Sequence, residues 1–178
     1  NLINSDVLQQ FSRKGLTINE GVAVDARLVQ SASHPISTEE IKKQREKRET
    51  PERKLDKNGN LLKFSRDLES DWTVKNDKLH YGLKEHATVD VDQGFVLSTD
   101  LTPASVSDSI YLPHCVAASC HTEDPIGKVY ADKGYYGEPN RDFLNMNGIA
   151  DGIMRKDTRS TKLTDYEKER NKGISKKR

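Results

Sequence analysis

Cysteine, methionine and tryptophan are scarce in this sequence of 178 residues, which holds two, two and one of them. The two cysteines, Cys115 and Cys120, lie five positions apart, which argues against a disulfide framework. Their neighbours His114 and His121 do not make this segment a zinc site, because residues five apart on a helix diverge by about 140°. We therefore expect reduced thiols and a fold that needs neither disulfide nor zinc.

Long apolar runs and a net charge are missing as well. No apolar stretch approaches the roughly 20 residues that a membrane helix needs, and the first residues lack a secretory pattern. Hydrophobic residues make up 33% and charged residues 32% of the sequence, and the formal net charge is +1. We expect one intracellular domain without a membrane partner, in which a packed sheet coexists with solvated stretches.

Positive charge is concentrated at one end of the chain. Residues 155–178 hold ten Lys or Arg against four Asp or Glu, which predicts a basic helical tail. Such a tail could contact phosphates or form a solvated helix face.

The first strand is predicted over residues 21–30 by alternation of apolar residues. Val22 and Val24 fall on one face, and Asp25 points from the other. Further strands are expected at residues 81–90, 95–101, 128–132 and 149–154, and helices at residues 7–14, 107–119, 138–147 and from 163 onward. Thr164 and Glu167 form a capping box for the last helix. The sequence predicts an α/β fold: a mixed sheet of about five strands flanked by helices.

A charged insertion follows the first strand. Between Glu39 and Lys57, 14 of 19 residues are charged, and Pro51 lies among them. We expect residues 36–70 to form a mobile surface insertion without a packed core element, helical for a few turns before Pro51.

Two carboxylates occupy positions suited to a metal. Asp25 lies in a strand and Asp132 at the carboxyl end of another, where ligands collect in open α/β sheets. Shared Mg²⁺, or Mn²⁺ in its place, would suit phosphodiester transfer. A strand-end cap or a salt bridge would explain either Asp as well.

Six segments together carry a resemblance to a known family. They are Gly21-Val-Ala-Val-Asp-Ala26, Asp71-Trp-Thr-Val-Lys75, His80-Tyr-Gly-Leu-Lys-Glu-His86, Leu101-Thr-Pro-Ala-Ser-Val-Ser-Asp108, Tyr130-Ala-Asp-Lys-Gly-Tyr-Tyr-Gly137 and Gly152-Ile-Met-Arg-Lys156. In this order they resemble the DDE domain of bacterial insertion-sequence transposases. The resemblance implies a ribonuclease H-like fold, magnesium-dependent cleavage of transposon ends and strand transfer. It also implies DNA as partner, a homo-oligomer in the synaptic complex, and a bacterial cytoplasmic location at the nucleoid.

The resemblance also implies roles for particular residues. The first two catalytic carboxylates of the family fall on Asp25 and Asp132. The third is a Glu downstream of a basic stretch like residues 171–178, so Glu167 and Glu169 are not assigned this role. We therefore expect residues 1–178 to be a partial catalytic domain with little strand-transfer activity. The alternative is an inactive remnant that binds DNA or a partner subunit; the motifs disfavour a nuclease unrelated to transposition.

Weaker predictions concern contacts with DNA. The candidate phosphate-contacting residues are Lys84, His86, Lys133, Arg155 and Lys156, each of which could equally lie on a solvated face. We expect Asp108 to cap the helix that follows it, and Trp72 to pack on the domain rather than stack on a base.

Overall fold

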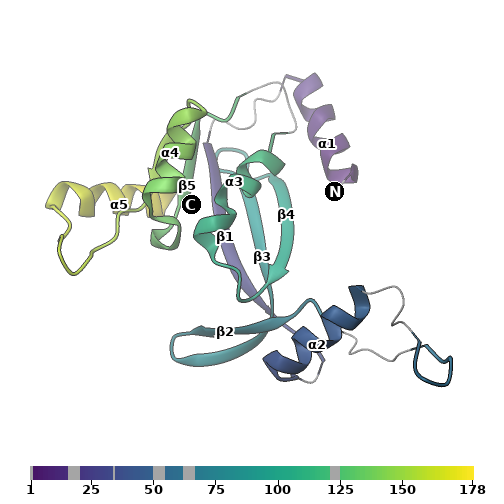
Figure 1. Cartoon of the computed structure of the whole chain (residues 1–178). Coiled ribbons are helices and arrows are strands. Elements are labelled where there is room, and N and C mark those ends of the chain that lie inside the picture. Colours follow the sequence, from purple (N-terminus) through teal and green to yellow (C-terminus); the bar gives the residue numbers. More distant parts are fainter. Residues whose placement is uncertain (1, 16–20, 34, 50–54, 62–66, 121–124) are drawn as a thin grey trace. The chain divides into compact units, whose positions relative to one another are not determined.

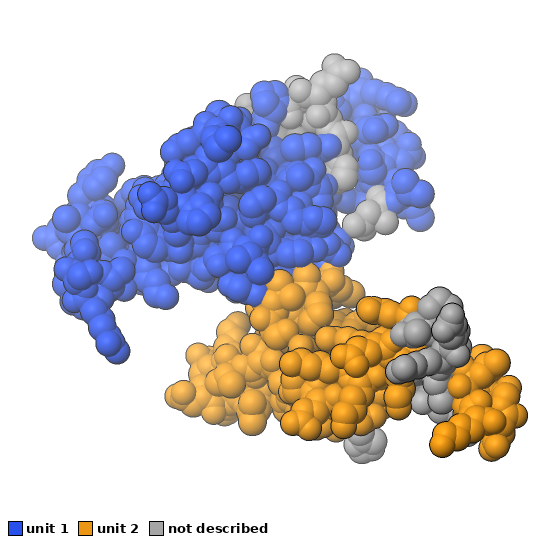
Figure 2. Space-filling model, in the orientation of Figure 1, with its two compact units in different colours: residues 1–26, 86–100, 107–178 blue, residues 27–85, 101–106 orange. Residues whose placement is uncertain are grey.

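The computed structural model describes residues 2–15, 21–33, 35–49, 55–61, 67–120 and 125–178. The chain divides into two compact units, shown in Figure 2. Unit 1 comprises residues 1–26, 86–100 and 107–178, and unit 2 comprises residues 27–85 and 101–106. Within the described ranges, none of the helices combines the length and apolar character that a membrane crossing requires.

A six-stranded mixed sheet organises the chain (Figure 1). Its hydrogen-bonded order is β2 (Asp71–Lys75), β3 (Lys78–Asp90), β1 (Gly21–Gln30), β5 (Lys128–Ala131) and β6 (Ala150–Ile153), with β4 (Val96–Pro103) paired to β3. Strands β1, β5 and β6 are parallel to one another, whereas β2 and β3 pair in antiparallel fashion. This mixed sheet with flanking helices is consistent with a ribonuclease H-like fold.

Unit 1 contains most of the apolar core. Its helices are α1 (Leu2–Arg13), α3 (Asp108–Ala118), α4 (Glu138–Met146) and α5 (Asp165–Lys177), and a short 3₁₀ helix, η2, spans Lys133–Tyr135. Helix α3 packs against η2 and α4, α4 against β6, and α5 against β5. Apolar side chains of β1, β5 and β6 are fully buried, among them Val22, Val24, Val129 and Ile153. Helices cover the first half of β1 and most of β5 and β6, and the residues buried there are apolar or glycine.

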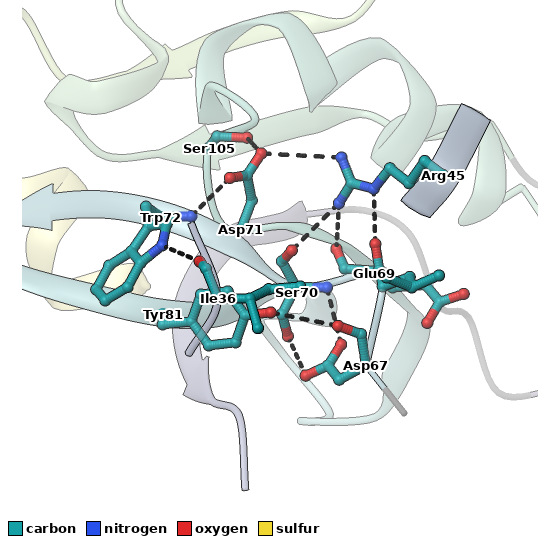
Figure 3. A network of polar contacts seen from close by, with 10 residues as sticks. Ile36, Arg45, Asp67, Glu69, Ser70, Asp71, Trp72, Tyr81 and Ser105 are labelled. Carbon is teal, nitrogen blue, oxygen red and sulfur yellow. Dashed lines mark hydrogen bonds and ion pairs between the residues drawn. The ribbon is translucent and has the colours of Figure 1, made fainter. Parts of the chain in front are cut away.

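Unit 2 contains α2 (Thr38–Glu49), which packs against β2. Figure 3 shows the polar network that holds this unit together. Arg45 donates hydrogen bonds to the backbone carbonyls of Leu68, Glu69 and Ser70. The carboxylate of Asp67 accepts hydrogen bonds from the backbone and hydroxyl of Ser70.

The observed elements confirm the predicted α/β fold, and the capping box of Thr164 and Glu167 is present. Two details differ. First, strand β2 was not predicted. Second, Ile41 of α2 is only 1% exposed, so the expectation that residues 39–57 contribute no packed element is wrong for α2. Pro51 lies outside the described residues.

Candidate metal-binding site

Asp25 lies within β1, and Asp132 follows the last residue of the neighbouring parallel strand β5 at the same level. Val24 of β1 is the register partner of Ala131 of β5, and each Asp is the next residue along its strand. Adjacent strands lie about 4.8 Å apart, so the register alone places the two carboxylates side by side. The sequence predicted both positions, but not the direct pairing of β1 with β5.

The turn after β5 fixes the Asp132 side chain. Asp132 caps the 3₁₀ helix η2, and its Oδ1 accepts a 2.7 Å hydrogen bond from the Gly134 backbone N–H. A Cβ on residue 134 would lie 2.9 Å from that same oxygen. Glycine is therefore the residue that lets the backbone approach the carboxylate, and Oδ2 of Asp132 stays free of this turn.

A single guanidinium group lies between the two carboxylates. Arg178 Nη2 is 3.1 Å from Asp25 Oδ2, and Arg178 Nη1 is 3.9 Å from Asp132 Oδ2. The Arg178 side chain is 21% exposed, whereas the side chains of Asp25 and Asp132 are 64% and 43% exposed. Oxygen atoms from two strands thus face one positive charge, and this is the donor chemistry that hard divalent ions prefer.

Helix α5 carries Arg178 to this place. Asn171 accepts a hydrogen bond from the Arg155 backbone N–H and donates one to the Arg155 carbonyl, at 2.8 and 2.9 Å. Arg170 donates to the carbonyls of Ile153 and Asp151. Asn171 and the buried Ile174 share a helix face with Arg178, because positions i, i+3 and i+7 align. The end of β6 therefore fixes the rotation of α5.

A cavity of about 670 Å³ opens beside Asp25. Asp25 and Asp90 contribute acidic groups to its lining, and the end of α5 contributes Lys176, Lys177 and Arg178. Asp90 is buried, so the cavity brings the exposed carboxylate of Asp25 next to the basic end of α5.

The candidate phosphate-contacting residues are scattered. Lys133 and Lys156 are exposed. Lys84 Nζ donates to the Val106 carbonyl, and Arg155 forms a 2.9 Å ion pair with Asp151. His86 is 1% exposed and its ring stacks on Tyr111 at 4.3 Å between centroids, so the interpretation of His86 as a phosphate contact is corrected: its side chain is part of the packing.

Several other predicted residues have structural partners. Glu167 accepts hydrogen bonds from the Thr164 cap, and Glu169 pairs with Lys172. Asp108 is the first residue of α3 rather than its cap, which is Ser107. Trp72 packs as expected: its Nε1–H donates to the Ile36 carbonyl, and its ring lies 5.2 Å from that of Tyr81 (Figure 3).

The thiols are free, as expected for a chain without a disulfide framework. Burial, with the Asp100 charge, raises the pKa of Cys115 to about 12, so this thiol is unreactive. Cys120 is exposed, and His121 lies outside the described residues.

Sequence reasoning missed the position of Arg178. The residue belongs to the basic tail, but only the helix phase set at Asn171 places its guanidinium between the two carboxylates. Among the described residues, no three His, Cys, Asp or Glu side chains gather closely enough to ligate one ion directly.

One carboxylate within β1 and one just after β5, side by side in a ribonuclease H-like sheet, are the arrangement typical of metal-dependent phosphoryl-transfer proteins. Comparison with known proteins identifies the family within this class. Residues 18–178 match the family described as "Transposase DDE domain", and the chain belongs to this family. Members of the family use divalent metal ions and bind DNA. The chain is similar to the transposase for insertion sequence element IS1106 of Neisseria meningitidis serogroup B, with 32% identity over 176 residues. The match covers 96% of this chain and 54% of the relative, so the chain spans about half the relative's length.

Proposed function

We propose that the chain supplies Asp25 and Asp132 as the metal-holding carboxylates of a transposase that cleaves DNA at insertion-sequence ends and transfers strands to a target. The observation that carries this proposal is the position of the Arg178 guanidinium, which pairs with both side chains at once. The register of β1 and β5 sets both carboxylates beside this one positive group, and a divalent ion in its place would draw on the same oxygens. Magnesium suits them, with manganese as substitute, because both ions take oxygen ligands.

Different residues of the chain have different roles in the proposed reaction. Asp25 and Asp132 hold the cation, and the Gly134 N–H orients Asp132 by occupying its Oδ1. When bound, a divalent ion activates the attacking hydroxyl and stabilises the leaving oxygen of the phosphodiester. Lys176 and Lys177 line the cavity beside Asp25 and would contact a DNA phosphate, Lys177 on release from its 3.7 Å ion pair with Asp92. Lys133 and Lys156, both exposed, are further candidates for phosphate contacts, and a homo-oligomer would bring two transposon ends together.

Metal binding by this chain tests the proposal at its base. Mn²⁺ is paramagnetic and broadens the NMR signals of nearby amides, so titration should broaden the Gly134 resonance, whose N–H is bonded to Asp132. Asp25→Asn and Asp132→Asn should each abolish this broadening, because each removes a charged ligand. Asp142→Asn removes an exposed carboxylate of α4 and serves as the matched control. Equal broadening in all four proteins would overturn the proposal.

Activity is tested in the whole transposase. Mg²⁺-dependent cleavage of DNA that carries the insertion-sequence end should be lost in Asp25→Asn and Asp132→Asn and kept in Asp142→Asn. If the chain instead binds end DNA equally well with and without Asp25 and Asp132, and the whole protein lacks cleavage, the alternative of a binding-only remnant is supported.

A further inference from the structure

A third carboxylate lies next to the Asp25–Asp132 pair. Asp108, the first residue of α3, places its Oδ2 within 3.7 Å of the point where a Cβ on Gly134 would stand, and Asp132 Oδ1 lies 2.9 Å from that same point. The absence of a side chain on Gly134 therefore leaves both carboxylates facing one small space. Asp108 is half-buried, so its oxygens have limited access to bulk water.

Asn140 connects the two backbone segments that carry Asp108 and Asp132. Its side-chain amide, 4% exposed, donates 2.8 Å hydrogen bonds to the carbonyls of Ser109 and Tyr135. Ser109 belongs to the start of α3, and Tyr135 belongs to the turn that follows Asp132. Asn140 bonds to neither carboxylate, but it ties the start of α3, which carries Asp108, to the turn that follows Asp132.

Tyr135 provides a second, independent indication of a ligand. The residue is 1% exposed, and its hydroxyl has no hydrogen-bond partner within the described parts of the chain. Burial raises the pKa of this hydroxyl, and the charges of Asp108, Asp25 and Asp132 raise it further, so the group stays protonated and can donate a hydrogen bond. A buried donor without an acceptor costs about 1–3 kcal/mol, which an additional partner at the site would recover.

We propose that Asp108 is a positioning residue for the cation held by Asp25 and Asp132, and that it acts through one of the cation's water molecules, with the Tyr135 hydroxyl as donor to the same carboxylate. This inference rests on the proposed function. Direct ligation by all three carboxylates does not fit, since no three acidic side chains in the described chain are close enough for one ion. Magnesium keeps several of its waters when bound, and an outer carboxylate that accepts from such a water orients the ion.

The test compares metal affinity with fold stability. Asp108→Asn should weaken Mn²⁺ binding about tenfold, followed at the Gly134 amide, because outer partners of a metal typically contribute 10–100-fold. Tyr135→Phe should weaken binding about fivefold, as expected for one lost hydrogen bond. Without the cation, the Asp108→Asn protein should have the same melting temperature as the native protein. The Tyr135→Phe protein should have the same or a higher melting temperature, because this substitution removes a buried polar atom. Asp142→Asn is again the control.

Hexamminecobalt(III) separates a water-mediated role from direct ligation, because its ammine ligands do not exchange and can only donate hydrogen bonds. Asp108→Asn should weaken its binding as well as that of Mn²⁺. Weakening of Mn²⁺ alone would make Asp108 a direct ligand and overturn the inference. Native Mn²⁺ affinity in Asp108→Asn would also overturn it, while loss of binding in Asp25→Asn would leave the proposed function standing. If the native chain shows no broadening of Gly134, both fail.

Discussion

Replacement of Arg178 by Gln should strengthen metal binding at the Asp25–Asp132 pair. The guanidinium pairs with both carboxylates, at 3.1 and 3.9 Å, so it competes with any cation that they could hold. Partly exposed ion pairs contribute about 0.2–1 kcal/mol each. Because Asp25 is 64% exposed and the second distance is long, we take the two contacts together as about 1 kcal/mol, which corresponds to about fivefold tighter Mn²⁺ binding.

The measurement is the Mn²⁺ dissociation constant at low salt and again at 0.5 M salt, where screening over about 4 Å should reduce the difference. Lys172→Gln is the matched control: it removes the same charge from the same helix, but Lys172 pairs with Glu169 instead. An Arg178→Gln protein that binds Mn²⁺ with native or weaker affinity would refute the reasoning. It would mean that the guanidinium helps to hold the site in place.

Two further predictions concern stability. Gly152→Ala should lower the free energy of unfolding by about 1–3 kcal/mol in urea titrations, because its Cβ would stand 2.5 Å from the Val129 carbonyl oxygen. The control is Gly173→Ala on an open face of α5, which should be neutral or stabilising. Equal effects of the two substitutions would contradict the packing argument. Burial raises the pKa of Asp67, but hydrogen bonds from Ser31 and Ser70 outweigh it and hold the pKa below its ordinary value. The stabilisation from Asp67 should therefore be present above a pH of about 4 and lost as the pH falls through the lower pKa of the folded state. In Asp67→Asn, the free energy of unfolding should depend less on pH in that range. An unchanged pH dependence in this variant would refute the prediction.

Local patterns were sufficient to predict five of the six strands. The alternation around Val22 and Val24 reflects burial on one side of β1, and the hairpin glycine Gly94 has the positive φ of 75° that its turn requires. Strand β2 has no such pattern: it is a short edge strand whose Val74 is 64% exposed, and its pairing with β3 depends on the turn at Asn76 and Asp77, both with positive φ. Edge strands bury little, so apolar periodicity does not mark them.

The sequence singles out the two carboxylates of the candidate site but does not give their geometry. Asp25 and Asp132 stood out by position and motif, yet the pairing of β1 with β5 joins residues 107 positions apart, which no local pattern encodes. Asp108 was expected to cap α3, since Asp is a common cap, but Ser107 takes that position and leaves the carboxylate one residue further on, beside Gly134. The burial of His86 likewise depends on stacking with Tyr111 of a separate helix.

The double hydrogen bond between Asn171 and the Arg155 backbone has a consequence for which insertions and deletions the chain tolerates. Seven residues, about two helical turns or roughly 10 Å, separate Asn171 from Arg178. One residue added between them would turn Arg178 by about 100° away from Asp25 and Asp132. Residues 157–163 form no helix or strand and precede the fixed point, so changes of length there leave the helix phase unaltered. Natural length variation in such chains should therefore collect before Thr164, where it leaves Arg178 beside the two carboxylates.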